Sequence, residues 1–134
     1  MSIASYLLVG LGCAFGGMAR FGVSDVVMRL TRAEGRERFP WDTLVTNVSG
    51  CFLIAVLAAL VLGDGRPMLD VVGRQLLMVG FLGGYTTFSA FSMQTLELAL
   101  AGDWVAAGLN IVVSVVLCLV AVSLGWLAGS AVSG

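Results

Sequence analysis

Four long stretches without a charged residue constrain this chain more than any other feature of its sequence. They cover residues 1–19, 43–63, 75–96 and 104–134, with lengths of 19, 21, 22 and 31 residues. A helix needs about 20 consecutive apolar residues to cross the hydrocarbon core of a bilayer. All four stretches meet this requirement, and none shows the alternation of a membrane β-strand. We therefore expect four transmembrane helices.

The composition agrees with lipid as the main solvent. Of the 134 residues, 59% are hydrophobic and 11% are charged, whereas soluble domains carry about 25% charged residues. The sequence therefore predicts an all-α integral membrane protein with a single membrane domain over 1–134. The N-terminal stretch lacks the positive flank of a signal peptide, so we expect a retained helix. The four spans are expected at 3–28, 42–62, 71–97 and 104–130.

The residue types that are missing exclude several function classes. The chain contains neither Lys nor His, its seven basic residues are all Arg, and its net charge is -1. Without His, a His-ligated metal, a catalytic His and a His proton relay are excluded. No basic patch suggests nucleic acid, and no carboxylate pair or activated nucleophile is evident, so we expect no enzyme. Cys13, Cys51 and Cys118 lie singly in apolar runs, which is typical of small buried side chains.

The distribution of arginine leaves the orientation in the membrane open. Positive residues in short loops favour the cytoplasmic side. The first polar connection carries four Arg, whereas the second connection and its flank, on the opposite side, carry Arg66 and Arg74. This small difference permits a fixed orientation, and it equally permits insertion in both orientations.

The third stretch contains a segment with little helical preference, in which two adjacent Gly precede two β-branched Thr. It reads Gly80-Phe81-Leu82-Gly83-Gly84-Tyr85-Thr86-Thr87-Phe88-Ser89-Ala90-Phe91-Ser92. We expect the helix to break mid-membrane between Gly83 and Thr86; the alternative is a continuous helix whose Gly serve close packing. Unwound backbone at this depth survives only when buried in protein or lining a polar cavity. Its freed carbonyls would suit a hard cation such as Na+.

Uncharged donors and aromatic rings gather in the second and third stretches. Phe88 and Phe91 share one helix face, and Ser89 and Thr87 adjoin them. The edge of an aromatic ring is positively polarised, so ring edges beside hydroxyl donors can replace part of an anion's water shell. Asn47 offers two amide donors. It either bonds to a neighbouring helix or donates to a permeating anion.

Two further polar features also have open interpretations. Asn110, Ser114 and Cys118 repeat every four residues and form a weakly polar stripe, although such side chains often bond back to their own helix. Arg20 either extends to the membrane interface or recruits anions at a pore mouth. No Lys or Arg lies deep in the last three spans, so an anion would bind weakly and leave again, as conduction requires. The residues describe a pathway for a small anion without identifying the anion.

These residues resemble those of the Fluc/CrcB family of fluoride channels. The resemblance covers essentially the whole chain, with a loose match in the fourth span, and depends on Arg20, Asn47 with Gly50, and above all residues 80–92. It implies a fluoride-selective channel that exports cytoplasmic fluoride passively across the bacterial inner membrane and so confers fluoride resistance. It also implies an antiparallel, dual-topology homodimer in membrane lipid, with two fluoride pathways.

The resemblance further implies roles for individual residues. The carbonyls of Gly83 and Thr86 from both subunits would hold a structural Na+ at the dimer centre. Cys118 stands where a second hydroxyl is usual, and Gln94 stands where some relatives are acidic. The fluoride pathway would comprise Asn47, Phe88, Phe91, Ser114, Thr87 and Ser89, with Arg20 recruiting anions.

Two other function classes compete with a fluoride channel. A small four-helix, proton-coupled multidrug exporter needs a carboxylate inside the membrane, and the only nearby acid, Glu97, ends the third stretch. A structural membrane protein, such as an assembly factor, would pass no ion. A general anion channel is a variant of the main hypothesis and predicts that chloride efflux matches fluoride efflux.

Overall fold

The computed structural model describes residues 2–35, 38–62 and 70–133, and within them every regular element is a helix. The elements are α1 (Ile3–Ala33), α2 (Trp41–Leu62), α3 (Val71–Gly73), η1 (Arg74–Leu82), α4 (Gly83–Tyr85), α5 (Phe88–Leu100) and α6 (Trp104–Ser133). The turn expected at 63–67 and residues 36–37 of the polar connection lie outside the described residues.

Four helical segments are long and apolar enough to cross a membrane. This confirms the expectation of four spans, and the chain is a multi-pass membrane protein. The segments are Ile3–Ala33, Trp41–Val61, Val71–Leu100 and Trp104–Val132, and even the least apolar has a mean hydropathy of 1.3. The helix α1 runs past the expected span end at residue 28, and Arg29 pairs there with Asp25 at 2.8 Å. A helix can thus continue beyond the membrane where its charges pair along one face.

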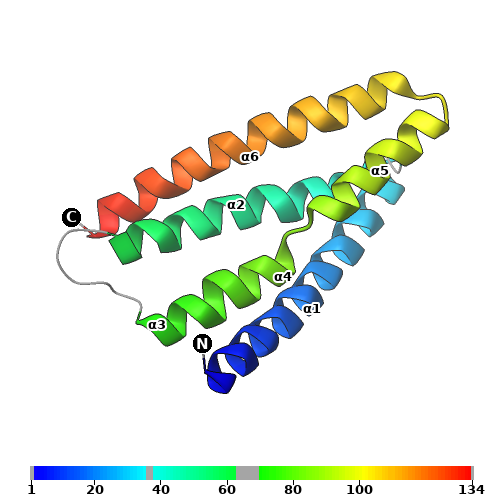
Figure 1. The fold of residues 1–134 in the computed structure, drawn as a ribbon. Coiled ribbons are helices and arrows are strands. Elements are labelled where there is room, and N and C mark those ends of the chain that lie inside the picture. The colour runs from blue at the N-terminus through cyan, green and yellow to red at the C-terminus, as the bar shows by residue number, and fades with distance from the viewer. Residues whose placement is uncertain (1, 36–37, 63–69, 134) are drawn as a thin grey trace.

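The helices pack in two groups, and the two halves of the broken third segment belong to different groups (Figure 1). The helix α2 lies along α6, and α1 packs against η1 and α4, while α5 turns away from α1 towards α6. Gly12 and Gly16 of α1 are buried in this contact. A Cβ at Gly12 would lie 2.8 Å from Gly80 Cα, and one at Gly16 would collide with the Phe81 carbonyl. Glycine therefore lets these two backbones touch.

The third helix is broken, but not where the two glycines stand. Gly83 has helical φ and ψ of -64° and -34°, and the helix continues through Tyr85. Thr86 and Thr87 are extended, with ψ of 156° and 111°. The break expected near Gly83 to Thr86 therefore lies at the end of that range, and Gly84 stays helical and serves packing: a Cβ there would lie 2.6 Å from the Cys13 carbonyl oxygen. The β-branched threonines suit the extended backbone that follows.

The segment before the break is wound more loosely than an α-helix. Residues Arg74–Leu82 form the π-helix η1, whose hydrogen bonds span five residues in place of four. The sequence pattern did not indicate this form. Such segments often occur at functional sites, and only the short α4 separates this one from the break.

Candidate functional site

A groove with a volume of about 440 Å³ lies beside the break, between α2, α6 and the two halves of the third segment. In the described part of the chain, every residue that lines it is uncharged. The groove brings together seven residues that the sequence analysis assigned to the fluoride pathway or to the Na+ site. They are Asn47, Gly83, Thr86, Thr87, Phe88, Phe91 and Ser114.

Asn47 of α2 holds the backbone of the break. Its Nδ2 donates to the Thr87 carbonyl at 3.0 Å, and the Thr87 N–H donates to Asn47 Oδ1 at 2.8 Å. Two backbone groups that leave the helical ladder thus find partners on a side chain. The amide carries two N–H donors, and only one is used in this pair. Asn47 therefore makes the interhelical bond and still has a donor for a ligand in the groove.

The break also removes the helical donors of carbonyls beside it, among them those of Gly83 and Thr86. In a continuous helix, the Gly83 carbonyl would accept from the Thr87 N–H. The Thr86 carbonyl would likewise accept from the Ala90 N–H. The Thr87 N–H instead bonds to Asn47, and the Ala90 N–H bonds to Thr87 Oγ1 at 3.2 Å. The two carbonyls that the sequence analysis singled out therefore lose their helical donors.

Phe88 and Phe91 lie at the start of α5, directly after the break. Their ring centroids are 5.3 Å apart, and both rings line the groove. Phe88 is 78% exposed in the single chain, so its ring lies on the open side. The Oγ1 of Thr87, the N-cap of α5, lies 3.2 Å from Ser89 Oγ. Ser89 does not line the groove, and it adjoins the groove only through Thr87.

A chain of hydrogen bonds connects α6 to the backbone of Phe91. Ser114 Oγ donates to Asn110 Oδ1 at 3.3 Å, and Asn110 Nδ2 donates to Thr95 Oγ1 at 2.8 Å. Thr95 Oγ1 in turn donates to the Phe91 carbonyl at 2.7 Å. Asn110 is only 1% exposed, so this chain fixes α5 against α6. The sequence analysis missed Thr95. The feature that could have indicated it is a hydroxyl four residues after Phe91, on the same helix face.

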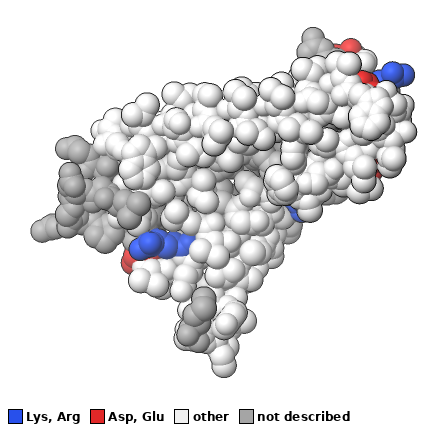
Figure 2. Space-filling model, turned by 45° about the horizontal axis from the view of Figure 1, so that its top comes forward, with Lys and Arg blue, Asp and Glu red and all other residues white. Residues whose placement is uncertain are grey.

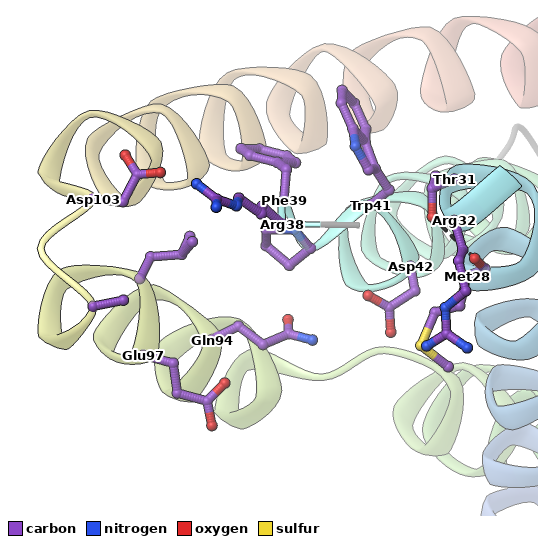
Figure 3. A pocket seen from close by; sticks show the side chains of 13 residues that line it. Met28, Thr31, Arg32, Arg38, Phe39, Trp41, Asp42, Gln94, Glu97 and Asp103 are labelled. Atoms are coloured by element: carbon purple, nitrogen blue, oxygen red, sulfur yellow. Dashed lines mark hydrogen bonds between the residues drawn. The ribbon is translucent and has the colours of Figure 1, made fainter. Parts of the chain in front are cut away.

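A second cavity, of about 610 Å³, lies where α1 ends and α2 begins (Figure 3). Unlike the groove, it is lined by both charge signs. Its charged residues are Arg32, Arg38, Asp42, Glu97 and Asp103. Trp41 and Gln94 also line this cavity, and within the described residues Trp41 Nε1 and Gln94 Oε1 are buried without a hydrogen-bond partner. Buried polar atoms of this kind usually bind water, so this cavity is suited to hold water.

Arg20 stands apart from both sites. It is half-buried on α1 and lines neither the groove nor the charged cavity. Recruitment of anions by Arg20 stays a prediction.

The fold and the groove define a multi-pass membrane protein whose third span is interrupted beside an uncharged groove. On the face in Figure 2 almost all charged side chains lie towards the ends of the long helices, as a membrane span requires. The family model described as "CrcB-like protein, Camphor Resistance (CrcB)" matches residues 7–126. The chain belongs to this family.

Individual relatives match along nearly their whole length. A protein of Opitutus terrae is 50% identical over 123 residues, which cover 92% of this chain and 90% of the relative. A protein of Paramagnetospirillum magneticum is 48% identical over 129 residues, covering 96% and 98% of the two chains. A protein of Coxiella burnetii is 42% identical over 123 residues, covering 92% and 95%. Each of the three is named "Fluoride-specific ion channel FluC".

Proposed function

We propose that this chain is a fluoride-specific ion channel, not an enzyme, and that the groove beside the break forms part of its pathway. One observation carries the proposal: a single uncharged groove contains Asn47, Phe88 and Phe91, in a chain whose close relatives are named fluoride-specific ion channels. The protein would release cytoplasmic fluoride passively across the bacterial inner membrane and so confer fluoride resistance.

Neutral groups suit this task because an ion that enters must also leave. The second N–H of Asn47, the hydroxyl of Thr87 and the ring edges of Phe88 and Phe91 would replace part of fluoride's water shell. A fixed positive charge in a region of low dielectric would bind the anion strongly. None of the described residues that line the groove carries such a charge. Fluoride would therefore pass without being held.

We further propose that two copies of the chain, inserted in opposite orientations, enclose the pathways. The exposed ring of Phe88 supports this arrangement, since 78% of its surface lacks cover in one copy. Many transporters build a midplane site between elements of inverted topology. The near balance of arginine between the two sides of the chain also permits both orientations.

The freed carbonyls of Gly83 and Thr86 support a structural Na+ at the centre of this dimer. Hard cations prefer oxygen ligands, and unwound backbone in membrane proteins commonly supplies them to Na+. Both carbonyls lose their helical donors through the bonds of Thr87 and Ala90. A bound Na+ would supply positive charge that holds the two breaks together.

Purified protein in liposomes tests the channel hypothesis directly. Liposomes loaded with fluoride, with no proton gradient, should release fluoride when the protein is present and keep it when the protein is absent. A proton-coupled exporter would instead require a proton gradient and a membrane carboxylate, as Glu97→Gln would reveal. A purely structural protein would release nothing. Either of these results would overturn the proposal.

A further inference from the structure

We propose that Cys51 and Cys118 form a two-thiol site for a soft divalent metal ion, and that an ion bound there blocks the groove. The first part stands on the structure of this chain. The second part rests on the proposed function, because it assumes that fluoride passes through the groove.

The two thiols lie together on the wall of the groove. Cys51 belongs to α2 and Cys118 to α6, and both residues line the groove. They approach the groove from two helices that pack along each other. Both cysteines are free and only partly buried. The third cysteine, Cys13, belongs to α1 and does not line the groove.

The packing of α2 against α6 holds the thiols at a set separation. A Cβ at Gly125 of α6 would lie 3.0 Å from the Ala55 Cβ of α2, and one at Gly129 would lie 2.7 Å from the Val56 carbonyl oxygen. These glycines allow the two helices to touch, and interiors packed this closely transmit strain and do not deform freely. A metal ion that binds both thiols would therefore lose little entropy in bringing them together.

The ligand set selects the kind of metal. Thiolates prefer soft ions, and both Cys must lose their protons to bind. One Hg2+ and two thiols give a neutral dithiolate complex and release two protons to water. A neutral complex avoids the cost of burying a charge. Within the described residues, no cluster of three or more His, Cys, Asp or Glu could hold a metal, so an ion that needs four protein ligands, such as structural Zn2+, does not fit.

The position of the site explains how an ion there would block passage. Cys118 lies one helical turn after Ser114, so both face the groove from α6. Asn47 and Cys51 bear the same relation on α2. A metal ion between the thiols would therefore stand beside the groups that we propose to bind fluoride.

A binding experiment tests the metal site without any transport. Cys13→Ser gives a matched background with only two thiols, to which Cys51→Ser or Cys118→Ser is added. Hg2+ is titrated into each protein in competition with glutathione. The mass of the intact protein then gives the number of Hg2+ ions bound per chain. The background protein should bind one Hg2+ per chain about 100-fold more tightly than either single-thiol variant, through the effective concentration of the second thiol. Equal affinity in all three would overturn the proposal.

A transport experiment tests the block, with each variant compared with its own untreated rate. Hg2+ should stop fluoride efflux in the Cys13→Ser background, and a dithiol chelator should restore it. Efflux in the variant that also carries Cys118→Ser should resist the same Hg2+ concentration. Equal inhibition of both proteins would overturn the block. Tight Hg2+ binding to a protein that passes no fluoride even before Hg2+ is added would overturn the proposed function and leave the metal site intact.

Discussion

The groove and the charged cavity lie about one and a half helical turns apart along α2, yet the residues that line them differ in charge. Every described residue that lines the groove is neutral, whereas five charged residues line the cavity (Figure 3). Two charges attract several times more strongly in a region of low dielectric than near water. The comparison teaches that this fold places a cluster of fixed charges at one end of the bundle and gives only neutral donors to the groove.

The comparison is tested most severely by Asn47→Ala. The substitution leaves the N–H and C=O of Thr87 without partners, and each unsatisfied group costs about 1–3 kcal/mol. We expect fluoride efflux to fall about 100-fold or more, together with a lower melting temperature. Ser49→Ala is the matched control, because it removes a bond to Tyr85 from the same helix and leaves the break intact. Wild-type efflux in Asn47→Ala would show that the break needs no support.

The packing of the third segment against α1 is tested by Gly84→Ala, with Gly83→Ala beside it as the control. A Cβ at Gly84 would lie 2.8 Å from Cys13 Cα, whereas a Cβ at Gly83 meets no atom within 4 Å. Overpacking of this kind costs about 1–3 kcal/mol. Thermal unfolding in detergent should therefore show a lower melting temperature for Gly84→Ala and an unchanged one for Gly83→Ala. An equal decrease in melting temperature for both variants would contradict the close packing of Gly84 against α1.

The aromatic part of the groove is tested by Phe88→Ile and Phe91→Ile. Isoleucine keeps the apolar bulk and removes the polarised ring edge, an interaction of about 0.5–1.5 kcal/mol. We expect efflux to fall about tenfold in each variant, while gel filtration shows an unchanged assembly. Phe15→Ile on α1, where the ring is 59% exposed and outside the groove, should keep wild-type efflux. Near-normal efflux in both groove variants would remove the rings from the mechanism.

Replacement of Na+ by a bulky organic cation tests the carbonyls of the break. If Gly83 and Thr86 hold Na+, its removal should weaken the dimer, because an ion that binds only the assembled state stabilises that state. The measurement is the dimer fraction against protein concentration in the two salts. Identical curves would argue against the sodium site.

The smallest effect is expected in the charged cavity. Glu97→Gln removes one of several water-exposed charges, and such charges contribute about 0–1 kcal/mol. Fluoride efflux should stay within about twofold of wild type. A collapse of efflux would assign the charged cavity a direct part in passage and erase the contrast with the groove.

The sequence predicted the spans and most of the groove because these depend on local patterns. Charge-free length defines a span, and the polar residues of the third segment are consecutive. Three features depended on contacts that local patterns do not contain. Gly84 stays helical and packs closely against α1, and the break follows at Thr86 and Thr87. Asn110 meets Thr95 from another helix, and the two thiols share one groove only because α6 lies along α2.

The most direct test of the central claim compares fluoride with chloride in the same liposomes. The claim is that a neutral groove can remove water from a small halide without holding it. The account predicts rapid fluoride release by the wild-type protein and chloride release no faster than from empty liposomes. Wild-type protein that released no fluoride, or that released chloride equally fast, would contradict it.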